Sequence, residues 1–447
     1  MSSSPVRIID TSYVNVPTTT TPPPEPIKLS SMEAIWVVFP VLQHVLLFED
    51  AAMPPFDAVV QSLKSSLAAT LASFAPLAGK LVHLKDTGDV AIICSPSDSV
   101  RFVVAESDTD VRPLAGDEEH DLPVLEQLVP DVDMSELPTA VLAVQVTRFE
   151  GGVAIGLTVH HAVADGRSFW TFVEAWAAAC RGETPATTPT FDRSLIKLPG
   201  DEELARSIFR KWLPNLPLVT RPLPRAEARS RFTCRTFTVD TADIQRLKQH
   251  IVSLGEADGE PLAGPPSTFV VVAALAWTCF ARCRPIAMDD DVLFHFIADV
   301  RGRLDPPVDA GYIGACLTRC VAMIPARELH GARALVAAAS ALQHEIRRMN
   351  GDPTNGQDHL APVVMAAWAD RLMLVSGSSR FKAYDIADFG WGKPTRTEPT
   401  RMNYDGQLAL MGARDGQGVQ VSVSLLQRSQ MDLFKSQLLE LLGKSTT

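Results

Sequence analysis

The heptad HHAVADG, residues 160–166, decides how the surrounding chain folds. Apolar residues dominate Val153 to His160, which predicts a buried strand ahead of it. Beyond it, from Phe169 to Cys180, apolar residues recur at intervals of three and four, the spacing of an amphipathic helix. We therefore expect a strand, a tight turn and a helix, with Asp165 or Ser168 as the helix cap.

Strand and helix patterns continue on both sides of this heptad and predict an α/β protein. The Gly151-Gly152 pair indicates a hairpin between the strand at 153–160 and an earlier strand at 140–149. The first 30 residues contain a Thr/Pro tract and are expected to be extended. The further elements predicted are helices at 57–76, 204–213, 241–252, 268–282 and 332–349, strands at 90–94, 100–104, 232–239, 292–300 and 316–324, and a terminal hairpin around 415–418.

The chain has 447 residues, too many for one ordinary core, so we expect two large domains. Residues 183–228 are rich in Pro, Thr and charge and are predicted to be a crossover linker. This divides the chain into an N-terminal domain, 1–182, and a C-terminal domain, 229–447.

Charge and apolar patterning exclude several classes of protein. The 41 Lys and Arg against 52 Asp and Glu give a formal charge of −11, which argues against nucleic acid or membrane as a partner. The longest apolar run, 269–280, is too short to span a bilayer. The N-terminus has no apolar signal core, so we expect a cytoplasmic protein. Seven Cys do not form a disulfide frame, and the CxxxC pairs at 279/283 and 316/320 are predicted to be buried, with no metal.

Two successive histidines end the predicted strand. Because strand side chains alternate, only one of His160 and His161 can face a given cavity. Three interpretations remain open for that residue: a structural core histidine, a metal ligand, or a general base. A metal site needs a third ligand, and no HExxH is present. The HxxxDG spacing at a strand–turn–helix junction favours a general base.

Two other segments carry unusual combinations of residues. In DFGWGKP, residues 388–394, two glycines and a proline surround a tryptophan, which predicts a fixed loop, with a purely structural turn as the alternative. In DVRGRLDPP, residues 299–307, charges follow directly after a strand. Charges in so apolar a setting must be paired.

Together these segments resemble the plant BAHD acyl-CoA-dependent acyltransferases. HHAVADG is similar to the family's HxxxD motif, and DFGWG matches its second signature. Residues 71–81 and 191–193 resemble the family's early helix-turn and crossover element. RLDPP at 303–307 and YIGAC at 312–316 resemble the malonyltransferase branch, from which Ile313 and Ala315 depart by replacing Phe and Asn.

The resemblance implies two chloramphenicol-acetyltransferase-like domains with the active-site channel at their interface. His161 would deprotonate the acceptor, which attacks the thioester directly, without acyl-enzyme, metal or cofactor. Asp165 would pair with Arg301 as structural support, and Trp391 is a candidate for positioning. The remaining residues expected to shape the two motifs are Gly166, Asp388, Phe389, Gly390 and Gly392.

Four residues are candidates for binding the acyl-CoA donor. Arg167 lies in the first helical turn and could bind the free carboxylate of a malonyl group, with a merely solvated arginine as the alternative. Lys248, Ser267 and Thr268 offer a cation and hydroxyl groups for CoA, although Lys248 fits an ordinary helix charge equally well.

The expected activity is malonyl transfer from malonyl-CoA to a hydroxyl of a phenolic, flavonoid or anthocyanin glucoside by a monomer. The alternative is a hydroxycinnamoyl-CoA-dependent O- or N-acyltransferase. A serine hydrolase requires a GxSxG elbow, and Gly377-Ser378-Ser379 lacks its second glycine. The intact His161 and Asp165 argue against a non-catalytic binding relative.

Overall fold

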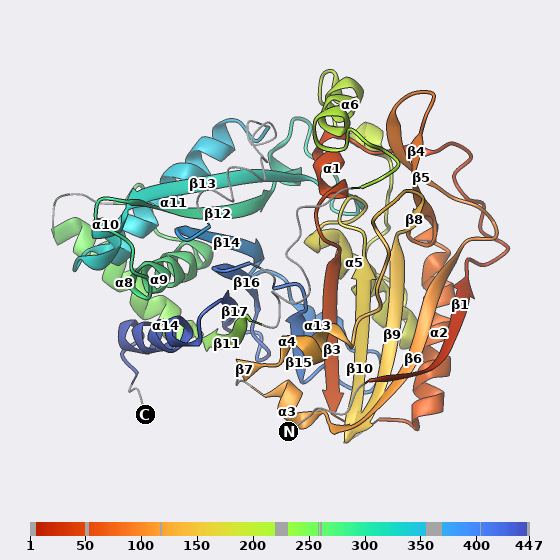
Figure 1. Ribbon diagram of the computed structural model, residues 1–447, viewed down its shortest axis with the longest axis horizontal. Helices are drawn as coiled ribbons and strands as arrows, with labels where there is room; N and C mark the ends of the chain where they lie inside the picture. Colours follow the sequence, from red (N-terminus) through yellow and green to blue (C-terminus); the bar gives the residue numbers. More distant parts are fainter. Residues whose placement is uncertain are drawn as a thin grey trace.

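The structure, a computed structural model, describes residues 6–49, 53–116, 119–219, 231–257, 259, 262–354, 369–402 and 404–444. Two large sheets stand side by side, each with helices against it (Figure 1). The predicted linker is described only as far as residue 219, and α6 (Asp201–Trp212) is its amphipathic helix. The last three residues and positions 220–230 lie outside the described residues.

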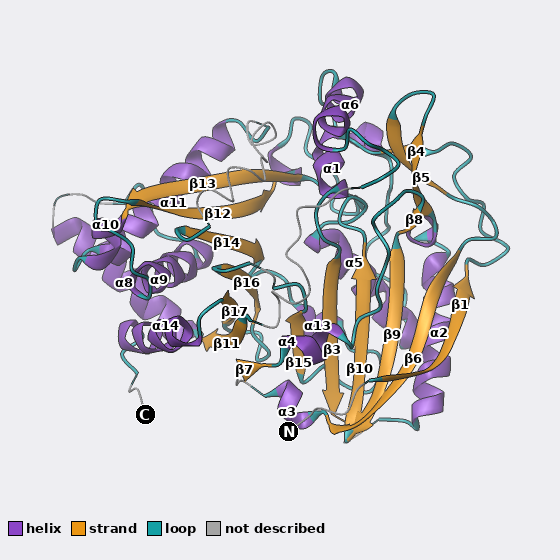
Figure 2. Ribbon diagram, in the orientation of Figure 1, coloured by secondary structure: helices purple, strands orange, loops and turns teal. Residues whose placement is uncertain are grey.

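The first sheet has six strands and is built around the predicted hairpin. Its helices α2 (Phe56–Leu71) and α5 (Gly166–Cys180) pack on each other and close the core of this half (Figure 2). Gly151 makes the hairpin turn with a φ of 73°. The strand order is β1 (Arg7–Asn15), β6 (Ser99–Asp110), β9 (Leu142–Glu150), β10 (Gly152–Val159), β3 (Leu42–Glu49) and β15 (Arg396–Pro399), with only β6 and β9 parallel.

The second sheet has seven strands, with its helices gathered on one face. The strand order is β13 (Leu317–Pro325), β12 (Asp291–Asp299), β14 (Leu372–Gly377), β16 (Gln407–Gly412), β17 (Val419–Leu425), β11 (Thr233–Val239) and β7 (Glu119–His120). The helices of this half are α8 (Thr241–Ala257), α9 (Thr268–Arg282), α10 (Ala326–His330), α11 (Ala334–Gly351) and α14 (Arg428–Leu441).

A small third sheet and short helices complete the fold. The sheet joins β2 (Ile27–Lys28), β5 (Asp89–Ile93), β4 (Lys80–Leu84) and β8 (Thr139–Ala140). The short helices are α1 (Ser31–Ala34), η1 (Ile35–Val37), η3 (Ala75–Ala78), α3 (Arg112–Ala115), α4 (Leu122–Glu126), η4 (Arg193–Leu195), η5 (Arg301–Arg303) and α13 (Ala383–Ile386).

The two halves exchange strands. β7, from the first 182 residues, pairs with β11 in the second sheet, and β15, from the last 60, pairs with β3 in the first sheet. The sequence division into 1–182, 183–228 and 229–447 remains a prediction about domains, and each sheet borrows a strand across it.

Several predicted elements differ from the structure. The helix expected at 57–76 ends at Leu71, because the later apolar positions Phe74 and Leu77 are buried by a 3₁₀ turn containing Pro76. Residues 7–15, expected to be merely extended, pair with β6 as an edge strand. The prediction omitted α14, although Met431, Phe434 and Leu438 have helical spacing and are buried.

Candidate active site

The turn between β10 and α5 holds the two histidines in different environments. His160 is 1% exposed, its backbone N–H donates to Val141, and its Nδ1 accepts from the N–H of Ala162 at 3.2 Å. His160 therefore helps to form the turn itself. His161 follows it outside the strand, and its ring stacks on Trp36 with centroids 4.1 Å apart and planes at 15°.

The environment of His161 keeps its imidazole neutral. Burial lowers its pKa to about 4 and outweighs the opposing effects of its own backbone carbonyl and of Asp165. Nδ1 is buried, which leaves Nε2 as the nitrogen able to face a substrate. A neutral imidazole with one accessible nitrogen can accept a proton at pH 7.

Asp165 is the N-cap of α5 and is completely buried. Its carboxylate accepts from Ser168 N–H at 2.9 Å, from Arg301 Nη1 at 2.6 Å and from Cys316 N–H at 3.2 Å. Burial alone would raise its pKa, but Arg301 and these donors together lower it. The predicted pair with Arg301 is confirmed. Both carboxylate oxygens of Asp165 accept hydrogen bonds from groups of the protein itself, which is a structural role.

Arg301 ties the second half of the chain to this turn. It lies in η5 directly after β12 and is 1% exposed. Besides Asp165, its guanidinium donates to Asp299 at 3.2 Å, to Ser168 Oγ at 3.1 Å and to the carbonyl of Gly314 at 2.9 Å. Since α5 belongs to the first half and β12 to the second, the HxxxD turn lies where the halves meet.

A second buried ion pair, which the sequence did not predict, supports the segment around Gly314. Arg193 donates to Glu33 at 2.7 Å and to the carbonyl of Ile313 at 2.7 Å. Glu33 is fully buried and also accepts from the N–H of Ala315 at 3.3 Å. A Cβ on Gly314 would lie 2.5 Å from the Glu33 carboxylate, so this position requires glycine. The Ser30-x-x-Glu33 capping box was the signal that could have identified Glu33.

The DFGWG loop is held by its own aspartate. Asp388 Oδ1 accepts from the N–H groups of Gly390 at 2.8 Å and Gly392 at 3.1 Å, and both glycines have a φ of 104°. Phe389 is buried and meets Trp176 edge-on at 5.0 Å. These contacts fix the loop on the first half.

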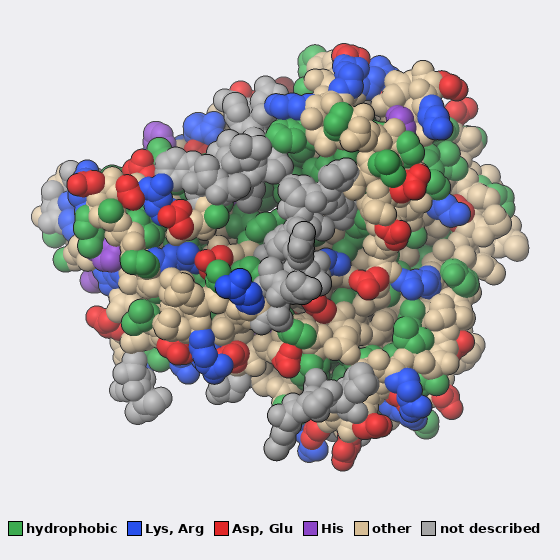
Figure 3. All heavy atoms as spheres, viewed as in Figure 1, with side chains coloured by type: hydrophobic (Ala, Val, Ile, Leu, Met, Phe, Trp, Pro, Cys, Tyr) green, Lys and Arg blue, Asp and Glu red, His purple; other side chains and the backbone are tan. Residues whose placement is uncertain are grey.

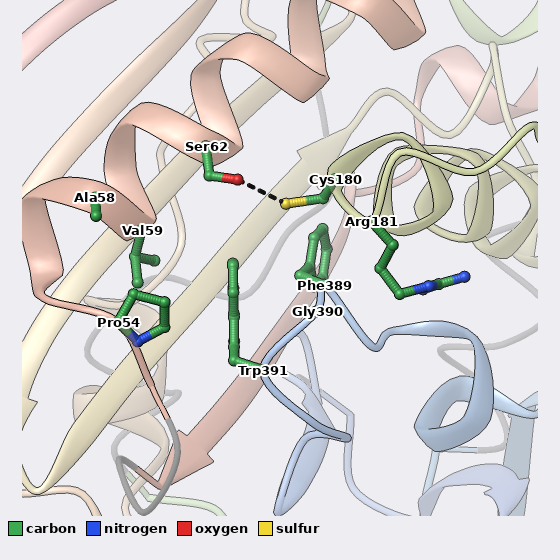
Figure 4. A pocket seen from close by; sticks show the side chains of 9 residues that line it. All are labelled: Pro54, Ala58, Val59, Ser62, Cys180, Arg181, Phe389, Gly390 and Trp391. Atoms are coloured by element: carbon green, nitrogen blue, oxygen red, sulfur yellow. Dashed lines mark hydrogen bonds between the residues drawn. The ribbon is translucent and has the colours of Figure 1, made fainter.

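Trp391 lies away from the histidines. It stacks on Phe389 at 5.8 Å and lines a pocket of about 570 Å³ between α2 and the C-terminal end of α5 (Figure 4). His161 precedes the N-terminal end of α5, and the 15 residues of α5 span about 20 Å. This geometry does not bring Trp391 to the reacting groups, and its expected positioning role there receives no support.

The donor-binding candidates fall into two separate groups. Lys248 Nζ donates to Thr268 Oγ1 at 3.3 Å, and Ser267 caps α9 by accepting from the N–H of Val270 at 3.3 Å. These three lie together where α8 and α9 meet. Arg167 lies beside Asp165 instead and is half-exposed, and its Nη1 pairs with Asp299 at 3.4 Å. The structure therefore gives Arg167 a partner that the sequence did not predict.

The described parts of the chain contain neither a metal-binding cluster nor a membrane-spanning helix. No group of three His, Cys, Asp or Glu side chains there could hold a metal ion, and no helix there is long and apolar enough to cross a membrane. On the face drawn in Figure 3, acidic and basic side chains are interspersed.

Comparisons with known proteins agree with the motifs. The Transferase family matches residues 5–441. Phenolic glucoside malonyltransferase 2 of Arabidopsis thaliana is 29% identical over 91% of this chain and 92% of its own. Agmatine coumaroyltransferase of the same plant is 27% identical over 96% and 98%. The crystal structure of vinorine synthase shares the fold, with a TM-score of 0.75 and 22% identity over 98% of each chain.

The fold prediction is thereby confirmed: the chain has the mixed α/β, two-domain, chloramphenicol-acetyltransferase-like fold. The sequence resembled one family in three features: the histidine turn, the Asp165–Arg301 pair, which is buried, and the DFGWG loop. The chain belongs to that family, the BAHD branch of the Transferase family, and is an acyl-CoA-dependent acyltransferase.

Proposed function

We propose that this enzyme transfers a malonyl group from malonyl-CoA to a hydroxyl of a phenolic, flavonoid or anthocyanin glucoside. The observation that carries the chemistry is His161: a partly buried, neutral imidazole with one accessible nitrogen, stacked on Trp36. The malonyl donor and glucoside acceptor are favoured by the RLDPP segment and by the phenolic glucoside malonyltransferase relative.

The reaction needs only a base, a positioned thioester and stabilisation of an oxyanion. His161 Nε2 takes the hydroxyl proton while the acceptor oxygen attacks the thioester carbonyl carbon. The tetrahedral intermediate collapses, the C–S bond breaks, and the CoA thiolate leaves and takes the proton from His161. No bond forms between the acyl group and the protein, and no metal or cofactor takes part.

We assign CoA binding to the group at the start of α9. Lys248 and Thr268 already contact each other, and Ser267 caps the helix whose N-terminus favours anions. The double variant Lys248→Ala/Ser267→Ala should weaken binding of CoA. Unchanged affinity, measured by calorimetry, would remove both from the site.

The second candidate is a hydroxycinnamoyl-CoA-dependent O- or N-acyltransferase. It is favoured by the coumaroyltransferase relative and by Ile313 and Ala315, which depart from the malonyltransferase pattern. A panel of malonyl-, acetyl- and coumaroyl-CoA against a mixed glucoside extract, read by product mass, separates the two. Coumaroylated products formed faster than malonylated ones would overturn the malonyl donor. The monomeric state and cytoplasmic location also remain predictions.

A further inference from the structure

One face of β12 and β13 carries two basic side chains that no established role explains. Phe294 and Phe296 of β12 contact aromatic rings of α9 and are buried in the core. His295 lies between them in the strand, so its side chain points to the opposite face. Arg319 of β13 pairs in register with Ile297 and therefore shares that face with His295.

This face is directed towards the first half of the molecule, near the HxxxD turn. Ile297 and Leu317 belong to it and pack against the core cluster of the first half. Arg319 is two residues beyond Leu317, about 7 Å along the strand. Asp299, opposite Leu317 in register, holds both Arg167 and Arg301. In Figure 1 the ends of both strands at these residues extend towards the first half.

Neither basic side chain has a partner in the part of the chain that the structure describes. Arg319 makes no ion pair or hydrogen bond within the described residues, its Nε is buried, and burial lowers its pKa. His295 is 3% exposed, and neither of its ring nitrogens has a hydrogen-bond partner among the described residues. Burial and then the Arg319 charge lower the pKa of His295 to about 3, so it is neutral. Buried polar groups are almost always satisfied, and an uncompensated guanidinium is costly.

We propose that Arg319 and His295 bind a carboxylate group of a substrate in the interface between the two halves. One guanidinium and one neutral imidazole supply a single positive charge with N–H donors, which suits a monoanion. A phosphate dianion would keep a net negative charge there. Arg167 fits this role less well, because Asp299 already compensates its charge. The proposal rests on the proposed acyl-CoA chemistry and deepens its substrate class.

The carboxylate could belong to the acyl donor or to the acceptor, and binding measurements distinguish the two. Calorimetry would compare malonyl-CoA with acetyl-CoA, and 4-hydroxycinnamate with its methyl ester, for the native protein, Arg319→Gln and the matched control Arg167→Gln. In Arg319→Gln the preference for the carboxylate form should fall by at least about tenfold in one of the pairs. Affinity for the uncharged form of that pair should not change, and Arg167→Gln should keep the preference.

Melting temperature provides the second readout. Removing an uncompensated charge should leave the melting temperature of Arg319→Gln equal or higher. Preferences that stay unchanged in both pairs, or that fall in Arg167→Gln instead, would overturn the carboxylate site. A lower melting temperature with unchanged preferences would make Arg319 purely structural. If the native protein binds neither CoA thioester, the proposed function fails, whereas normal donor binding with no effect of Arg319→Gln refutes only this inference.

Discussion

His161 and Asp165 are four residues apart and both have lowered pKa values, but His161 is neutral and Asp165 is charged. For His161 burial dominates and keeps the ring neutral, whereas for Asp165 the adjacent Arg301 keeps the carboxylate charged. The HxxxDG spacing predicted a general base and a helix cap. Arg301 as the partner of Asp165 came from the resemblance to the family. It could not predict Trp36, which stacks on His161 from a distant part of the chain.

The pH dependence of the reaction should reflect the depressed pKa of His161. The base is active when neutral, so kcat/KM should lose activity only as the pH falls through about 4, not through the ordinary value near 6.5. Short assays after a pH jump, with the enzyme returned to pH 7 to check its recovery, measure this limb. An acidic limb near 6.5 would mean that the imidazole is solvated.

Asp165→Asn should destabilise the protein and slow it. Arg301 would then be a buried guanidinium facing a neutral amide, and breaking such a pair costs about 3–5 kcal/mol in the free energy of unfolding. Urea denaturation measures this loss. Arg167→Gln is the control, because its half-exposed pair with Asp299 should contribute less than about 1 kcal/mol. Equal effects of the two changes would contradict the structural role of Asp165.

Among the elements, the strands and helices around the heptad were predictable because each has its own characteristic spacing of apolar residues. Helix α5 begins after Asp165 as the cap required, and α9 has the bounds that the apolar run indicated. β15 could not be predicted, since its four residues include Arg396 and Glu398, both buried, and its place depends wholly on pairing with β3. Short strands that long-range contacts define have no local signal.

Asp388→Ala tests the DFGWG loop as a scaffold. The change leaves the exposed N–H groups of Gly390 and Gly392 without their acceptor, which should cost about 0.5–1.5 kcal/mol of stability. Because the loop is about 20 Å from His161, the folded variant should keep kcat within a few-fold of normal. Asp385→Ala, which removes an exposed pair with Lys393, is the control and should change little. A large loss of kcat with normal stability would place the loop in the reaction.

At the scale of the whole molecule, the exchanged strands β7 and β15 meet in one buried network. His120 of β7 and Arg396 of β15 both contact Glu398, at 3.3 Å and 2.7 Å, and Ser422 of β17 donates to it at 2.8 Å. Burial alone would raise the pKa of Glu398, but these partners lower it to about 2. Both sheets therefore depend on the same carboxylate, which links the stability of the two halves.

Acid should destabilise the whole protein in two stages. His44, His161 and His295 have pKa values of about 4, 4 and 3, so between pH 6.5 and 4 the unfolded chain binds more protons. Each of these histidines lowers the free energy of unfolding by about 1.4 kcal/mol per pH unit in that window. Glu398, whose pKa is depressed, adds its loss only below about 4.5. Urea denaturation at pH 6.5 and 5 measures the first stage.

His44→Leu is the matched variant for this measurement. It should reduce the loss of stability between pH 6.5 and 5 by about 2 kcal/mol, because one of the three histidines no longer takes up a proton on unfolding. An unchanged loss would show that His44 titrates normally in the folded protein.

The measurement that tests the central claim most directly is turnover of His161→Ala. As the general base, His161 should contribute at least about 10²–10³ to kcat, whereas melting temperature and CoA affinity should remain near normal. His160→Ala removes the ring that accepts from the N–H of Ala162 in the turn, so it should lower the melting temperature more than kcat. A folded His161→Ala enzyme with near-normal kcat would contradict the mechanism, since the neighbouring imidazole of His160 is 1% exposed and its Nδ1 already accepts from the N–H of Ala162.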